Sequence, residues 1–184
     1  MRIRWVIAAL SALALALLTL NVDFPTSLRH LLRPASAPST GKCPANAKAA
    51  NLNFTLKDID NKEVRLADLK GKVILLDFWA TWCGPCKIEI PWFVEFQKRY
   101  GKDGLQVVGV SVDDTPDKLR PYVRDLKMNY PVLLGLERDD VQDAYGPMLG
   151  IPVSVLISRD GKVCGRHTGL AAKDRFEFEI RSLL

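Results

Sequence analysis

Two cysteines separated by two residues lie where an apolar run gives way to a helix, in Trp82-Cys-Gly-Pro-Cys86. The preceding residues 73–79 read Val-Ile-Leu-Leu-Asp-Phe-Trp, which predicts a buried strand interrupted by one acid, Asp77. A thiol at the start of a helix faces unpaired N–H groups and the positive end of the helix dipole, and both favour the thiolate. The junction therefore predicts redox chemistry rather than packing.

The helix after the cysteines is predicted to continue to about residue 100 and to contain Pro91. It carries an apolar side chain at every fourth position: Ile88, Trp92, Phe96 and Tyr100. This spacing predicts that these four side chains form the buried face of an amphipathic helix.

Strands and helices alternate along the rest of the chain, and an antiparallel hairpin ends it. Further strands are predicted at residues 53–56, 63–66, 105–112, 131–134, 153–158 and 162–166. Further helices are predicted to begin at Pro116 and to cover residues 139–145 and 171–184. This order predicts an α/β fold with a mixed central sheet flanked by helices.

The charge pattern argues against nucleic-acid binding. The net charge of +5 is modest for 184 residues, and the lysines and arginines are scattered rather than gathered in a stripe with aromatic residues between them. The length suits one domain plus a tail.

The N-terminus predicts a signal or a membrane anchor over residues 1–23. Arg2 and Arg4 precede Trp5–Leu20, a run of 16 uncharged residues rich in alanine and leucine. The only Ala-Ser-Ala site lies downstream at residues 35–37, so an uncleaved anchor is favoured over a cleaved signal. The catalytic part is then expected on the periplasmic or outer side of the membrane, with a cleaved, secreted form as the alternative.

Residues 24–50 are rich in proline, serine, alanine and lysine without periodicity, which predicts a flexible tether. The folded domain is then expected to cover residues 51–184.

Three features resemble thioredoxin: residues 77–86, Pro91 five residues after the second cysteine, and Gly150-Ile-Pro152 before a late strand. The run 83–91 is further similar to the membrane-tethered thiol-disulfide reductases of the TlpA/ResA type. The resemblance covers about residues 51–184. It implies a thioredoxin fold and an extracytoplasmic protein thiol-disulfide oxidoreductase without a cofactor.

The resemblance implies a role for each residue of the cysteine motif. Cys83 would be the exposed nucleophile that forms a mixed disulfide with a partner, and the more buried Cys86 would resolve it. Gly84 and Pro85 shape the turn, and in thioredoxins this pair accompanies reducing potentials. Trp82 is expected to contact the partner protein.

Pro152 matches the family's cis-proline, which lies against the active-site sulfurs. A cis bond there would present the backbone of Ile151 for pairing with a substrate peptide and would crowd metal away from the thiols. No metal site is therefore expected.

Two acids compete for the proton-handling role. Asp77 matches the buried acid behind the second cysteine of thioredoxins, and Glu89 matches a glutamate of the tethered reductases. A buried carboxyl group stays protonated to unusually high pH and can exchange a proton with Cys86. Many of the tethered reductases have a neutral residue at the position of Asp77, so the choice between the two acids stays open.

The two remaining cysteines have two interpretations. Four cysteines outside the cytoplasm allow three pairings, and pairing Cys83 with Cys86 leaves a structural disulfide between Cys43 and Cys164. Alternatively, Cys164 and His167 could complete a zinc site with the first cysteine pair, which the cis-proline and the hairpin position disfavour. Neither His30 nor His167 has an acid or thiol partner that the sequence identifies.

The expected partners are disulfide-containing proteins and a membrane electron donor, since an oxidising compartment cannot reduce the dithiol again. The protein is expected to be a monomer, and preparation of apocytochrome c is one use by family analogy. An oxidase or isomerase of the same fold, and a binding module with an inert Cys83–Cys86 bond, are the alternatives. A peroxide-reducing role is disfavoured, because Thr81 does not fit the Pro-x-x-x-Thr-x-x-Cys frame.

Overall fold

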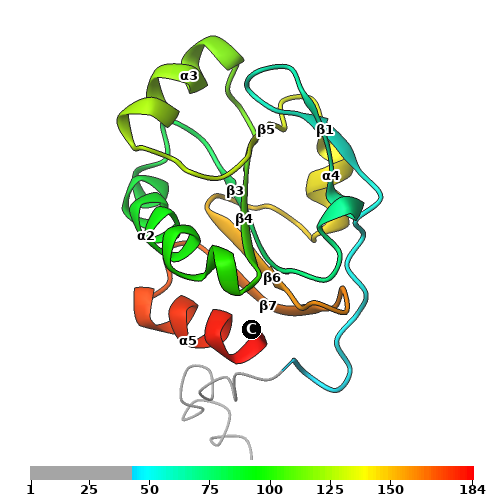
Figure 1. Cartoon of the computed structure of the whole chain (residues 1–184). Helices are drawn as coiled ribbons and strands as arrows, with labels where there is room; N and C mark the ends of the chain where they lie inside the picture. The colour runs from blue at the N-terminus through cyan, green and yellow to red at the C-terminus, as the bar shows by residue number, and fades with distance from the viewer. Residues whose placement is uncertain (1–42) are drawn as a thin grey trace, which may run out of the picture. The chain divides into compact units, whose positions relative to one another are not determined.

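The computed structural model describes residues 43–184, which form a five-stranded mixed sheet covered on both faces (Figure 1). The strand order is β5-β4-β3-β6-β7; β3, β4 and β5 are parallel, whereas β6 and β7 are antiparallel to their neighbours. The strands of this sheet are β3 (Val73–Trp79), β4 (Leu105–Ser111), β5 (Val132–Leu134), β6 (Val153–Ile157) and β7 (Val163–Thr168). A separate hairpin pairs β1 (Thr55–Lys57) with β2 (Glu63–Arg65).

Four α-helices and two short 3-10 helices complete the fold within residues 43–184. The α-helices are α2 (Gly84–Tyr100), α3 (Pro116–Asp125), α4 (Asp139–Ala144) and α5 (Lys173–Leu183), and the 3-10 helices are η1 (Leu66–Leu69) and η2 (Gly101–Asp103). The predicted mixed sheet with helices on both faces is thus confirmed. Boundaries differ slightly: β1 begins at Thr55 rather than residue 53, and β7 extends to Thr168 rather than residue 166.

Alternating side chains of β3 divide the core into two parts. Leu75 and Trp79 belong to the core cluster beneath α2, α3 and α5, whereas Ile74 and Phe78 belong to the cluster beneath α4 and the β1–β2 hairpin. Figure 1 shows α2 and α5 together on one side of the sheet and β1 and α4 on the other. By the same alternation, Asp77 points toward the face that α2 covers.

The helix α2 buries a different face from the one its four-residue spacing predicts. Its buried side chains are Cys86, Glu89, Ile90, Phe93 and Phe96, whereas Ile88 is half exposed. An α-helix has 3.6 residues per turn, so a strict four-residue step drifts around the axis, and only alternating steps of three and four stay on one face. Pro91 lies inside α2 without ending it.

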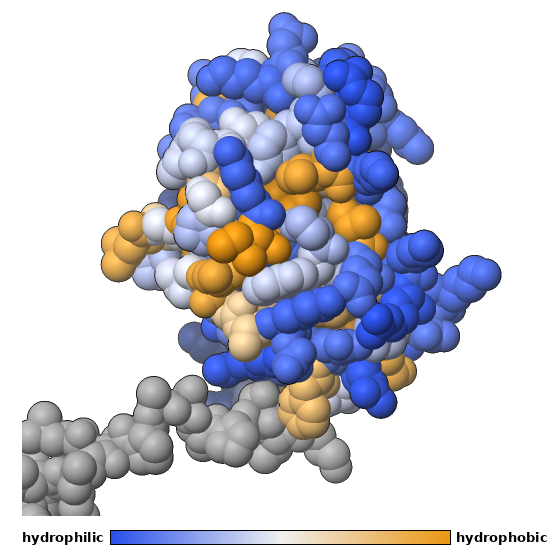
Figure 2. Space-filling view, turned by 90° about the vertical axis from the view of Figure 1, so that its left-hand side faces the viewer, coloured by the Kyte–Doolittle hydropathy of each residue, from blue (hydrophilic) through white to orange (hydrophobic). Residues whose placement is uncertain are grey.

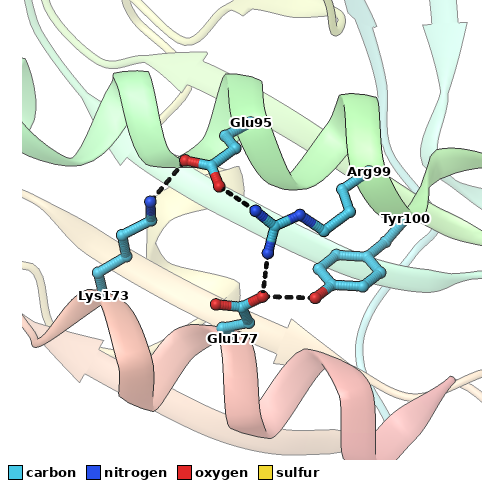
Figure 3. A network of polar contacts seen from close by, with 5 residues as sticks. All are labelled: Glu95, Arg99, Tyr100, Lys173 and Glu177. Carbon is cyan, nitrogen blue, oxygen red and sulfur yellow. Dashed lines mark hydrogen bonds and ion pairs between the residues drawn. The ribbon is translucent and has the colours of Figure 1, made fainter.

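Polar side chains join α2 to α5 along their exposed edges (Figure 3). Glu95 accepts from Arg99 on its own helix and from Lys173 on α5. Glu177 on α5 accepts from Arg99 and from the Tyr100 hydroxyl. We call these five residues the α2–α5 clamp.

Residues 43–50, assigned to the tether from their composition, belong to the folded unit. Val163 N–H donates to the Lys48 carbonyl, Ala50 N–H donates to the Gly161 carbonyl, and a disulfide joins Cys43 to Cys164. The folded unit therefore begins no later than Cys43 instead of at residue 51. Within residues 43–184 no helix combines the length and apolar character needed to cross a membrane, and the predicted anchor at residues 1–23 lies outside this range.

Candidate active site

The two cysteines of the motif form a disulfide at the start of α2. Cys83 is the N-cap of this helix, and its sulfur accepts a hydrogen bond from the Cys86 N–H at 3.2 Å. Pro85 occupies the first turn, where its missing N–H costs no hydrogen bond. The sulfur of Cys83 therefore lies where an N–H group and the helix dipole both stabilise negative charge.

The expected exposure of Cys83 is wrong for this oxidised form. Cys83 is only 2% exposed and Cys86 is fully buried, so the two sulfurs differ little in accessibility. As the N-cap, the Cys83 side chain folds back over the first turn to reach Cys86, and both residues join the core cluster that Ile151 also contacts.

A buried aspartate holds the loop that leads into the motif. The Asp114 carboxylate accepts from the Thr81 N–H and from the Thr81 hydroxyl, both at 2.7 Å, and from the Ser111 hydroxyl at 3.0 Å. The sequence interpretation missed this residue. Its only signal was a pair of acids directly after a buried strand, at the same sheet edge as the dithiol.

Trp82 lies on the surface beside this loop, with 63% of its side chain exposed, and its ring N–H donates to Asp113 at 2.8 Å. Ile88 and Leu149 are also exposed apolar side chains, and Leu149 lies three residues before Pro152. Figure 2 views the side on which α2 begins and shows apolar residues gathered across the middle of this face, with polar residues above and below.

The bond between Ile151 and Pro152 is cis, the isomer expected from the family pattern. Pro152 is buried and directly precedes β6, the neighbour of β3 in the sheet. The strands β3 and β6 are antiparallel, so the start of β6 lies beside the end of β3, which leads into the cysteine loop. The cis bond and the dithiol therefore lie at the same end of the sheet.

Asp77 is buried in the middle of β3. The Ser154 hydroxyl donates to its Oδ1 at 3.1 Å, and its Oδ2 has no hydrogen-bond partner among the described residues. Burial and, to a smaller extent, the charge of Glu89 raise the pKa of Asp77 well above its usual value, and the Ser154 bond opposes them. Asp77 is thus a carboxyl group that resists ionisation.

Glu89 is also buried rather than solvated on its helix face. Its Oε1 accepts from the Ala171 N–H at 3.0 Å, and Oε2 has no hydrogen-bond partner within residues 43–184. Burial raises the pKa of Glu89 to about 7, against the lowering effects of the Ala171 bond and the positive charge of His167. At neutral pH this carboxyl group can therefore both accept and release a proton.

His167 has an acid partner, contrary to the sequence interpretation. Its Nε2 lies 2.7 Å from Oε2 of Glu179 on α5, and both side chains are almost fully buried. The sequence carried no signal for this pair, because the contact depends on how α5 packs back over β7. The disulfide to Cys43 leaves Cys164 without a thiolate, so the alternative zinc pairing of Cys164 with His167 does not form.

Comparison with known proteins places this geometry in a family. Residues 46–166 match the AhpC/TSA family. The chain belongs to the AhpC/TSA family. Among curated proteins, the thiol-disulfide oxidoreductase ResA of Bacillus thuringiensis subsp. konkukian is 30% identical over 131 residues, which is 71% of this chain and 75% of that protein.

A second relative and a solved structure are similar to this chain as well. ResA of Bacillus subtilis is 38% identical over 117 residues, which is 64% of this chain and 64% of that protein. The crystal structure of a thiol:disulfide interchange protein of the thioredoxin family from Chlorobium tepidum TLS is 30% identical, with a TM-score of 0.69, and covers 76% of this chain and 98% of that one. The predicted thioredoxin fold and the resemblance to ResA-type proteins are thereby confirmed, and this AhpC/TSA member is a thiol-disulfide oxidoreductase.

Proposed function

We propose that this protein reduces disulfides in other proteins outside the cytoplasm through a dithiol formed by Cys83 and Cys86. One observation carries the proposal: two buried acids, Asp77 and Glu89, share the α2-covered face of the sheet with a disulfide at a helix start. An inert structural disulfide has no use for buried carboxyl groups, which destabilise the fold whenever they ionise.

The proposed reaction passes two electrons to the substrate in two steps. The Cys83 thiolate attacks one sulfur of the substrate disulfide, the other substrate sulfur leaves as a thiolate, and a mixed disulfide forms. The Cys86 thiol then gives its proton to a carboxylate and attacks the Cys83 sulfur. This attack re-forms the Cys83–Cys86 disulfide and releases the second substrate sulfur as a thiolate. The two substrate thiolates take up protons from solvent.

Glu89 is the better candidate for the carboxylate that takes the Cys86 proton. Its pKa of about 7 leaves a substantial ionised fraction at neutral pH, whereas the pKa of Asp77 is raised by complete burial. Glu89 also lies three residues after Cys86, on the same buried face of α2. Asp77 then stays protonated as a neutral acid and adds no negative charge that would oppose thiolate formation.

The substrate is proposed to bind across the cis-proline and the exposed tryptophan. The backbone of Ile151 would pair with an extended substrate segment, and Pro152 would lie against the active-site sulfurs. Trp82 offers an exposed apolar ring, while Gly84 and Pro85 keep the turn narrow enough for the segment to approach Cys83.

The location and direction of the reaction are proposed from the sequence. The Gly84-Pro85 pair favours a reductant, and the segment 1–23 would anchor the enzyme with its domain on the periplasmic or outer side. A membrane electron donor would then return two electrons to the disulfide, and apocytochrome c is one possible substrate. The enzyme is proposed to act as a monomer.

Reduction of an insulin disulfide by the reduced protein tests this proposal. We expect turnover with the wild type and none with Cys83→Ser, while Cys86→Ser should trap a mixed disulfide. No turnover by the reduced wild type would refute the reductase function and favour the binding module.

The equilibrium of the Cys83–Cys86 pair with glutathione separates reductase from oxidase. A reductase should keep its disulfide in a glutathione buffer that reduces oxidising relatives. Full reduction in that buffer would favour the oxidase or isomerase alternative.

A further inference from the structure

The loop between α4 and β6 carries the cis-proline and is held at both ends. At its far end the Gly169 N–H, just past β7, donates to the Pro152 carbonyl at 2.8 Å. At its near end Tyr145 lies in the core, and its hydroxyl donates to the Asn51 carbonyl at 2.6 Å. Between these ends, the backbone of residues 148–151 makes no hydrogen bond within residues 43–184. Its amide and carbonyl groups are therefore free to pair with another chain.

Arg166 on β7 binds this loop with its guanidinium group. Its Nε donates to the Tyr145 carbonyl at 3.0 Å, and its Nη2 donates to the Pro147 carbonyl at 2.8 Å. Its Nη1 donates to Oγ1 of Thr168, on its own strand, at 2.8 Å. A guanidinium group presents its donors in one rigid plane, so it can hold two carbonyl groups in a set geometry. One side chain thus fixes the segment that leads into the unpaired backbone.

The backbone at Gly146 suits this contact. Gly146 lies between the two residues whose carbonyls Arg166 binds, and its φ of +99° is in the left-handed region. A Cβ at this position would meet Arg166 at 3.6 Å, which is an ordinary contact, but a side chain would strain the backbone. Glycine therefore allows the turn that brings both carbonyls to one guanidinium group.

Arg166 lies on the face of the sheet that does not hold the dithiol. It is directly opposite Val155 on β6, whose side chain belongs to the core cluster beneath α4. Residues directly opposite each other in antiparallel strands place their side chains on the same face. Cys83 and Cys86 belong to the other cluster, beneath α2. Arg166 can therefore act on the reaction through the loop that it holds rather than by touching the sulfurs.

We propose that Arg166 is a positioning residue for substrate binding: it holds the loop so that the unpaired backbone of residues 148–151 is already in place for a substrate peptide. The proposal rests on the pairing role of Ile151 given above. A loop that is ordered before binding loses less conformational entropy when the substrate arrives, which tightens binding without changing the sulfur chemistry. Arg166 should therefore matter for disulfides within a peptide chain and not for small disulfides.

The first test compares two substrates of the pre-reduced protein in single turnover. Insulin carries its disulfides in a peptide chain, whereas bis(2-hydroxyethyl) disulfide is neutral and has no peptide groups. In Arg166→Gln we expect the half-saturating insulin concentration to rise about threefold or more at an unchanged maximal rate. The rate with the small disulfide should stay at the wild-type value. An equal loss with both substrates would overturn the proposal, because the small disulfide cannot pair with the loop.

Three further variants separate the planar group from its charge. Arg166→Lys keeps the positive charge but has no planar fork for two carbonyls, so it should behave like Arg166→Gln. Thr168→Val removes only the acceptor on β7 and should stay close to wild type. The matched control is Arg120→Gln, which removes an exposed guanidinium group that binds the Asp60 carboxylate. Full recovery in Arg166→Lys would show that charge alone suffices and would refute the role of the guanidinium group.

Hydrogen exchange measures the loop without any reaction. The Tyr145 N–H donates to the Gln142 carbonyl and the Gly146 N–H donates to the Asp143 carbonyl, each at 3.1 Å. Both amides should exchange about threefold faster or more in Arg166→Gln than in wild type, because the end of α4 opens more often. Unchanged exchange would overturn the positioning role whatever the rates are.

The outcomes for the reductase function and for Arg166 can be told apart. A wild type that reduces neither disulfide would end the proposed function and this role with it. Turnover by the wild type with the same insulin saturation curve in Arg166→Gln would refute the role of Arg166 alone and leave the reductase function intact.

Discussion

Asp77 and Glu89 are acids enclosed by apolar side chains next to a disulfide, and each destabilises the fold when it ionises. Both pKa values are raised, chiefly because burial removes the carboxylate from water. The pKa of Glu89, about 7, lies within the usual working range of an enzyme. Two buried acids that interact electrostatically therefore suit two tasks, one as a neutral neighbour and one as a proton acceptor.

The pH dependence of stability should reveal Glu89. Its pKa rises from 4.5 to about 7 on folding, so the native state holds more protons than the unfolded state between these values. The free energy of unfolding should therefore fall as pH rises through this window and stay low above it. Glu89→Gln has no carboxyl group at this position, so its free energy of unfolding should not fall in this window. The difference in the free energy of unfolding between Glu89→Gln and wild type should therefore grow, in favour of the variant, by on the order of 1 kcal/mol or more between pH 5 and pH 8.

Urea unfolding at several pH values measures this difference. The exposed Glu63→Gln is the matched control and should follow the wild-type curve. Parallel curves for Glu89→Gln and wild type would contradict the raised pKa of Glu89.

The two neighbouring aspartates after β4 should differ sharply in importance. Asp114→Ala leaves the Thr81 N–H and two hydroxyl groups without an acceptor, at an expected cost of about 2–4 kcal/mol in the free energy of unfolding. Asp113→Ala removes only the exposed bond to Trp82 and should cost about 0.5 kcal/mol or less. Chemical denaturation of both variants gives the comparison, and equal costs would contradict it.

Sequence reasoning at the residue scale found the groups with local signatures and missed those defined by packing. The cysteine pair and Pro152 can be recognised from the residues next to them in the sequence. Glu179 and Asp114 do not, because they meet their partners only after α5 and the β4–α3 loop have folded into place. The burial of Cys83 was missed for a related reason, since it arises where the start of α2 packs into the core cluster.

Among the elements, α2 depends on α5 to cover its outer edge. The α2–α5 clamp lies on this edge and combines acids and bases from both helices (Figure 3). A partly exposed ion pair contributes little to the free energy of unfolding, so the α2–α5 clamp should add only modestly to the stability of the packed helices.

Glu177→Gln tests the clamp. It weakens the contacts to Arg99 and Tyr100 and should lower the free energy of unfolding by about 1 kcal/mol or less at low salt, with a smaller effect at high salt. Asp125→Asn, in the exposed pair with Arg124, is the control and should have no measurable effect. A large, salt-independent loss in Glu177→Gln would indicate a packing role instead.

Strand positions were predictable because buried strands are short runs of apolar residues bounded by turns, and β3 was located to the residue. The buried face of α2 was not predictable, because aromatic residues occur on both sides of this helix and Glu89 faces inward. A polar residue on a core face is invisible to hydrophobic periodicity.

For the whole molecule, the disulfide between Cys43 and Cys164 closes a loop with a sequence separation of 121 residues. Closing so long a loop restricts the unfolded chain, so Cys43→Ser with Cys164→Ser should lower the free energy of unfolding by roughly 4–5 kcal/mol at most. Thermal unfolding of the double variant measures the loss. The dithiol of the folded double variant should react as in wild type, and a slowed dithiol would mean that the second disulfide also shapes the active site.

The first described residues lie along both borders of the sheet. Backbone bonds from residues 48–50 cover the start of β7, while Ile59 N–H donates to Val132 of β5 on the opposite border. Unpaired strand borders invite pairing with other copies and hence aggregation. A shortened version starting after β2 would expose both borders at once, so these early residues help to keep the protein soluble at the concentrations that expression and purification require.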